Sequence, residues 1–136
     1  MIFLAGTLID TDAMPPKYAS RILSVDEIPT APGLTREIVN HFAEIYEADA
    51  WDIRRSPLLV ESWQGVARKA VISVCGWDPR RDEGILFEEL LREAGVEVRM
   101  DVHKGLPHGF WTVCRGLDLS RAWEAKLVEN VRWLIE

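Results

Sequence analysis

An aspartate and a histidine, each a little beyond an expected strand, are the side chains of this sequence best suited to chemistry. Asp78 lies in the stretch 76–84, which reads GWDPRRDEG, and His108 follows thirty residues later (78 to 108) in 106–110, which reads LPHGF. A buried aspartate that accepts the Nδ1–H of an imidazole fixes its tautomer and stabilises the imidazolium. The second ring nitrogen is then free to take a proton from a nucleophile, so the pair is the general-base half of an acyl-transfer site.

The nucleophile that such a pair would serve is not recognisable in the sequence. No G-x-S-x-G elbow occurs, and none of the serines is flanked by glycines in that pattern. These serines are Ser20, Ser24, Ser56, Ser62, Ser73 and Ser120. Cys75 is not expected to replace a serine, because it lies in the strand before Asp78 rather than on a strand-to-helix turn. Taken alone, Asp78 before a proline also fits a turn, and His108 among proline and glycine also fits an exposed loop.

Three segments of the sequence are expected to form strands. Residues 2–9 and 69–75 are continuous apolar runs, which are typical of strands covered on both faces. From Val96 to Val102 apolar and polar residues alternate, which predicts a strand with one solvated face at or near the edge of a sheet.

Helices are expected between and after these strands. Residues 36–47, 82–94 and 119–135 carry apolar side chains at helical spacing, and Gly95 is placed to end the second helix. Residues 10–34 are expected to be irregular, because prolines interrupt any helix there. The alternation of strand and helix predicts a single α/β domain with a parallel sheet and right-handed crossovers.

This arrangement brings the two candidate residues to the same place. In open parallel sheets, chemistry gathers in the crevice beyond the carboxyl ends of the strands. Adjacent strands lie only ~4.8 Å apart, so loops that leave neighbouring strands at the same edge can join a carboxylate to an imidazole. We therefore expect Asp78 and His108 to meet at this edge.

Other polar and aromatic residues receive simpler interpretations. His41 is expected to be solvated on its helix, and His103 to lie on the polar face of the last strand. Asp82 is interpreted as a helix cap. Trp77 and Trp111 flank the acid and the base, so either is a candidate for the wall of an acyl or alcohol pocket as well as for the core.

Composition excludes several classes of partner. The net charge is −6 with no run of Lys or Arg, which disfavours nucleic acid and anionic membranes. No apolar run approaches the ~18–20 residues of a membrane span. Three histidines without matching carboxylates predict no metal site, and no nucleotide fingerprint occurs. Cys75 and Cys114 are too few for a disulfide scaffold, so a reducing, cytoplasmic setting is the default expectation.

Three motifs together resemble one protein family. The stretch 76–84, the stretch LLREAGVEV at 90–98 and HGF at 108–110 resemble the C-terminal half of the hormone-sensitive-lipase-like branch of the α/β-hydrolases. That family reads D-P-L-R-D-E-G, then a helix ending in A-G-V, then H-G-F. A proline-rich loop and helix leading to SPLL at 56–59 resemble its upstream element. The resemblance covers most of the chain and is strongest over about 51–112.

The resemblance assigns roles and shows where this sequence differs. It implies that Asp78 is the triad acid and His108 the triad base of a carboxylic-ester hydrolase that needs no metal or organic cofactor. Small or medium hydrophobic esters are the implied substrates. Arg80 stands where the family usually has an apolar residue. The family's nucleophile elbow and H-G-G-G-type loop precede the strand expected at 2–9, so we expect this chain to correspond to the last three strands of a partial hydrolase fold.

A competing interpretation stays open at this point. Without an elbow, the chain also fits a catalytically inactive hydrolase remnant, or a ligand-binding or interaction protein on the same scaffold. The first strand would then have an unpaired, apolar outer edge, which is a template for association. We therefore predict self-association through residues 2–9, and a monodisperse monomer by light scattering at micromolar concentration would contradict it.

Overall fold

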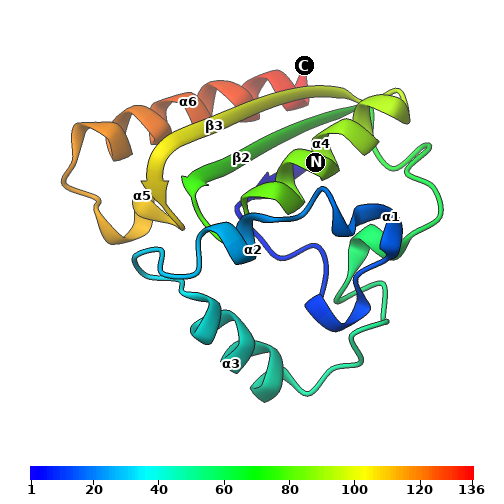
Figure 1. The fold of residues 1–136 in the computed structure, drawn as a ribbon. Coiled ribbons are helices and arrows are strands. Elements are labelled where there is room, and N and C mark those ends of the chain that lie inside the picture. The colour runs from blue at the N-terminus through cyan, green and yellow to red at the C-terminus, as the bar shows by residue number, and fades with distance from the viewer.

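The computed structural model describes all 136 residues, and a three-stranded parallel sheet forms its centre (Figure 1). The strands are β1 (Ile2–Leu4), β2 (Lys69–Trp77) and β3 (Glu97–Pro107), in the order β1-β2-β3. Phe3 pairs with Ile72, and Ile72 in turn pairs with Met100. The predicted α/β class with parallel strands alternating with helices is confirmed. β3 is an edge strand, as its sequence alternation indicated.

Two helices cover the two faces of the sheet. α4 (Arg81–Glu93) and α6 (Asp118–Ile135) lie on opposite sides of β2 in Figure 1. Because successive side chains of a strand point to opposite faces, Ile72 and Val74 of β2 pack under α4, whereas Ser73 contacts Trp123 of α6. None of the helices combines the length and the apolar character needed to cross a bilayer.

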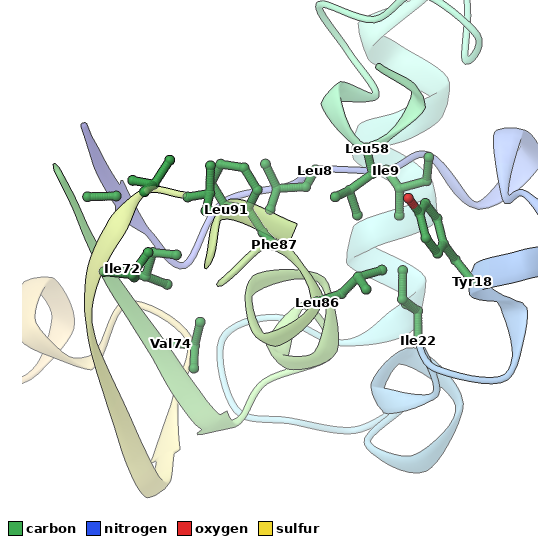
Figure 2. Close-up of a cluster of buried hydrophobic side chains, with 13 residues drawn as sticks. Leu8, Ile9, Tyr18, Ile22, Leu58, Ile72, Val74, Leu86, Phe87 and Leu91 are labelled. Carbon is green, nitrogen blue, oxygen red and sulfur yellow. The ribbon is translucent and has the colours of Figure 1, made fainter. Parts of the chain in front are cut away.

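The main core lies between the sheet, α4 and the segment before β2 (Figure 2). Leu86, Phe87 and Leu91 of α4 meet alternate side chains of β2, and the loop residues Leu8 and Ile9 complete the layer. A Cβ added at Gly84 would stand 2.3 Å from a methyl carbon of Val74, so glycine permits this close approach of helix to sheet. Burial of these side chains stabilises the sheet edge that carries the candidate site.

The first strand is shorter than the sequence predicted. The expectation of a strand over 2–9 is wrong beyond Leu4, because Ala5 takes a left-handed φ of 44° and turns the chain out of the sheet. Leu8 and Ile9 are buried in a loop instead of a strand. Their backbone N–H groups donate to the carboxylate of Glu83, which is itself buried. The apolar run is therefore divided between a strand and a loop held by α4. The outer edge of β1 has no partner in this structure, and self-association there stays a prediction.

The expectation that residues 10–34 lack helix is also wrong in detail. The short helices η1 (Thr11–Ala13), α1 (Pro16–Ala19) and α2 (Ser24–Glu27) form between the prolines. Pro16 is the first residue of α1, where its missing N–H costs no helical hydrogen bond. The prolines thus set where helices begin instead of excluding them.

The helix α3 (Arg36–Tyr46) begins and ends close to its predicted bounds, but its apolar face is not in the core. Phe42, Ile45 and Tyr46 are exposed, and Val39 is its buried residue. The one-turn helix η2 (Pro57–Leu59) then buries Leu58 completely and anchors the segment before β2. The apolar face of α3 is therefore available to line a cavity.

Candidate active site

The predicted acid and base meet at the carboxyl edge of the sheet. Trp77 and Pro107 are paired at the ends of β2 and β3, so Asp78 and His108, one residue further on, leave the sheet side by side. His108 Nδ1 lies 2.8 Å from Asp78 Oδ2. A register shift between Cys75 and Trp77 precedes this pair, as bulges often do beside active sites.

Asp78 is held by backbone as well as by the imidazole. Its side chain is 1% exposed, and its second oxygen, Oδ1, accepts the backbone N–H of Arg80 at 2.8 Å. Both carboxylate oxygens are therefore used, which fixes the plane of the carboxylate toward His108. A carboxylate placed in this way selects the imidazole tautomer that carries its proton on Nδ1.

His108 faces outward from this contact. Its side chain is 34% exposed, and its Nε2 is not hydrogen-bonded to any other side chain. Gly109 follows with a left-handed φ of 60° and starts the one-turn helix α5 (Phe110–Val113), which Phe110 anchors in the core. The predicted base is thus on a loop with a fixed beginning and end, and one of its ring nitrogens has no hydrogen-bond partner.

Cys75 lies beneath the pair and is poorly suited to replace a nucleophile. Burial raises the pKa of its thiol to about 11, although the backbone amides of Gly109 and Phe110 act in the opposite direction. A thiol of that pKa is protonated at neutral pH. This agrees with the sequence interpretation of Cys75 as a buried structural residue.

A cavity of about 660 Å³ opens beside the imidazole. His108 and the loop Ala5–Thr7 line one side, and α3 lines the other with Phe42, Ile45 and Tyr46. The apolar face of α3, exposed with respect to the core, therefore forms an apolar wall of the cavity that His108 also lines. Cavities of this volume and lining are typical of small-molecule sites.

A buried ion pair that the sequence analysis missed supports the same cavity. Arg55 forms a salt bridge to Asp10, and both side chains are almost fully covered. Ser56 Oγ accepts the backbone N–H of Asp10 at 2.9 Å and donates to Ala50 O. These contacts hold the loop after β1 against the segment before β2. The residues are 45 apart in sequence, so no local pattern could have paired them.

The other residues singled out from sequence lie outside this site. Trp77 is exposed and Trp111 is packed in a separate core cluster, so the suggestion that either lines the pocket is wrong. Asp82 does not cap its own helix; its Oδ2 accepts the backbone N–H groups of Leu23 and Ser24 and so holds α2. No cluster of three potential metal-ligating side chains occurs in the structure.

His103 lies on the polar face of β3, as predicted, but α6 partly covers that face. Its Nε2 lies 2.8 Å from the buried Ser73 Oγ, which accepts the Trp123 Nε1–H at 3.0 Å. Burial lowers the pKa of His103, and nearby Asp101 acts in the opposite direction. The face expected to be solvated is therefore only partly exposed, and a polar network joins sheet and helix there.

Comparisons with known proteins agree with this fold and extend over most of the chain. A family profile described as the alpha/beta hydrolase fold matches residues 11–112. The AB hydrolase superfamily protein B1A11.02 of Schizosaccharomyces pombe is 31% identical over 132 residues, which are 97% of this chain and 39% of that protein. The versiconal hemiacetal acetate esterase of Dothistroma septosporum is 28% identical over 128 residues, 91% of this chain and 38% of the esterase.

A solved structure has the same fold over nearly the whole chain. The crystal structure of vibralactone cyclase matches with a TM-score of 0.93 and 36% identity, over 98% of this chain and 39% of that one. The chain thus spans about two fifths of the length of these relatives. With its parallel sheet and the matched residues 11–112, the chain belongs to the α/β-hydrolase fold family, in its hormone-sensitive-lipase-like branch.

Proposed function

We propose that this chain supplies the acid and the base of a Ser–His–Asp triad in a carboxylic-ester hydrolase. The observation that carries the proposal is the contact of 2.8 Å between His108 Nδ1 and Asp78 Oδ2, with the imidazole opening into an apolar cavity. Esterases among the relatives support the reaction class. Metal and cofactor play no part in the proposed reaction.

In this proposal the two residues have separate roles. His108 Nε2 takes the proton of a serine hydroxyl as its oxygen attacks the ester carbonyl, and then gives that proton to the leaving alcohol. Asp78 accepts the Nδ1–H and stabilises the imidazolium that forms. Water, deprotonated by the same Nε2, then attacks the acyl-enzyme and releases the acid and the free serine.

The serine of the proposed triad comes from a segment outside these 136 residues. No serine, threonine or cysteine side chain is hydrogen-bonded to His108, and Ser73 is engaged with His103 and Trp123 between the sheet and α6. The chain covers only 38% of the similar esterase, which leaves most of that protein's length to carry a nucleophile and oxyanion donors.

The cavity gives a general preference among esters. Its wall of Phe42, Ile45 and Tyr46 fits an apolar acyl or alcohol group of small or medium size. Burial of each additional methylene against such a wall contributes about 0.8 kcal/mol. Hydrophobic esters are therefore the substrates that we propose.

A chimera tests the proposal. The part of the Dothistroma esterase that aligns with this chain is replaced by the aligned residues of this chain, and p-nitrophenyl butyrate turnover is measured. We expect the chimera to hydrolyse the ester and its His108→Ala variant to be inactive, with His41→Ala, an exposed histidine of α3, as the matched control. The 136-residue chain alone is expected to resist labelling by a serine-directed phosphonate. A folded His108→Ala chimera with normal turnover would contradict the assignment.

One observation also favours a second candidate, a non-catalytic binding module. The cavity is complete enough within this chain to have walls from α3 and from the sheet edge. Binding of an apolar ester by the isolated chain, together with an inactive but folded chimera, would favour this alternative.

A further inference from the structure

Arg80, at the position where the sequence departs from the family pattern, lies at the cavity beside the proposed base. Its backbone N–H donates to Asp78 Oδ1, and its side chain, 10% exposed, contributes to the cavity wall. Asp78 therefore links Arg80 to His108, one through each carboxylate oxygen. Arg80 and His108 therefore share both a hydrogen-bond partner and a cavity.

Three of the five N–H groups of this guanidinium, on Nε and Nη2, have no protein acceptor. Nη1 donates to Ile9 O at 3.3 Å and to Glu83 Oε1 at 2.5 Å, whereas Nε and Nη2 have no protein acceptor. No buried side-chain nitrogen or oxygen in the structure lacks a hydrogen-bond partner. Nε and Nη2 are therefore not fully buried, and Arg80 is one of the residues that line the cavity.

Neither of the other two arginines of the cavity combines a covered guanidinium with free donors. Arg55 uses all three nitrogens, on the carboxylate of Asp10 and on backbone carbonyl groups. Arg54 is paired with Asp52, and its side chain is 88% exposed to solvent. Arg80 is thus the one cavity cation that is both covered and incompletely paired.

Its position is also rigid. Glu83, which receives Nη1, is fully covered and accepts the backbone N–H groups of Leu8 and Ile9 on its other oxygen. A guanidinium held in this way loses little conformational freedom when a ligand binds. The free Nε–Nη2 edge presents two parallel N–H groups, the geometry that matches a carboxylate with two hydrogen bonds.

We infer that Arg80 is a specificity-determining residue that selects esters carrying a free carboxylate on an apolar chain. The carboxylate binds the Nε–Nη2 edge, and the chain lies along Phe42 and Ile45 of α3. This inference rests on the proposed function for the identity of the ligand as an ester. It needs no turnover for its test, because the contact is one of binding.

The test is a titration of the 136-residue chain with monomethyl adipate, dimethyl adipate and hexanoate at pH 7, followed by calorimetry and by the arginine Nε–H signals in ¹H–¹⁵N spectra. We expect the monoester to bind about tenfold more tightly than the neutral diester, because the bidentate ion pair is lost in the diester. The Arg80 Nε–H signal should move with the monoester. Equal affinity for the two esters, or no movement of that signal, would overturn the inference.

Variants of Arg80 and Arg81, and hexanoate as the third ligand, test whether carboxylate binding depends on Arg80. Arg80→Met is expected to lower monoester affinity to the level of the diester, Arg80→Lys to lower it less, and Arg81→Met, whose arginine lies outside the cavity, to leave it unchanged. If Arg80→Met unfolds because Glu83 is left unpaired, Arg80→Met/Glu83→Gln removes both charges together. Hexanoate binding without monoester binding would mark a product-acid site and overturn the substrate inference. The proposed function is tested separately, by measuring whether ester turnover of the chimera depends on His108.

Discussion

Two histidines, His103 within β3 and His108 just beyond its end, make hydrogen bonds of equal length but lie in different surroundings. His108 Nδ1 and His103 Nε2 are each 2.8 Å from an oxygen, one of Asp78 and the other of Ser73. His108 lies beyond the carboxyl end of β3 and opens into a cavity. His103 lies within β3, beneath α6, with aromatic rings of Phe110 and Trp111 around it.

The difference shows what separates a candidate catalyst from a structural histidine on one sheet. A carboxylate partner stabilises an imidazolium, as a general base requires, whereas a hydroxyl partner and burial favour the neutral ring. Access differs as well: His108 has a free nitrogen at the cavity, and His103 is held in a network with Trp123. In the proposal, the same residue type therefore serves chemistry just beyond the end of the strand and packing five residues earlier.

The largest expected effect concerns the carboxylate of Asp78, which contacts His108. In the chimera with the Dothistroma esterase, Asp78→Asn is expected to lower kcat by about 10⁴, by analogy with the worked serine-protease triad, because the amide favours the wrong imidazole tautomer. Ester turnover of the purified chimera measures it. Asp101→Asn, beside His103, is the matched control and should leave kcat within a fewfold. Equal losses in both variants would remove the distinction between the two histidines.

The second effect concerns stability. Ser73→Ala leaves Trp123 Nε1–H and His103 Nε2 without their partner, so we expect the free energy of unfolding to fall by about 1–3 kcal/mol. Urea denaturation of the 136-residue chain measures it. Ser62→Ala, at an exposed turn, should change little. A Ser73→Ala chain as stable as the unmodified one would contradict a structural role for the network.

A smaller loss of stability is expected when Trp123, the residue that α6 contributes to the network with Ser73 and His103, is changed. Trp123→Phe keeps an aromatic ring to stack on Trp111, which lies 4.3 Å from it between centroids, but removes the N–H that donates to Ser73. We expect about 1 kcal/mol in the free energy of unfolding. If the loss in the double variant Ser73→Ala/Trp123→Phe equals the sum of the two single losses, the side chains are not coupled.

The smallest effect is a pH dependence from His103. Burial lowers the pKa of His103 in the folded chain, so the unfolded chain binds the proton at higher pH. This stability is present above the unfolded value of about 6.5 and is lost as pH falls toward the folded pKa. We expect His103→Gln to flatten the decline in unfolding free energy between about pH 7.5 and 5.5. Parallel pH profiles for the two proteins would show that another group is responsible.

Part of this site follows from sequence because it depends on local order. Asp78 and His108 each follow a strand, and parallel strands bring their ends to one edge, so the sequence could predict that they meet. Gly84 belongs to the same motif, and a side chain there would collide with Val74 of the strand just before it. Both features involve residues that are close in sequence or lie at the ends of adjacent strands.

The rest depends on contacts between distant residues. Asp10 and Arg55 pair across 45 positions, and Glu83 binds backbone N–H groups about 75 residues away. The alternation of β3 predicted a polar face correctly but could not show that α6 would partly cover it and His103 with it. Likewise, helical spacing identified the apolar face of α3 without showing that it faces a cavity.

The most direct test of the central claim compares His108→Ala with His103→Ala in the chimera, with ester turnover and thermal unfolding measured for both. We predict that His108→Ala lowers turnover by orders of magnitude with little change in Tm. His103→Ala should lower Tm and leave kcat of the remaining folded protein nearly unchanged. Normal turnover in a folded His108→Ala chimera, or equal losses of turnover in both variants, would contradict the assignment of His108 as the base.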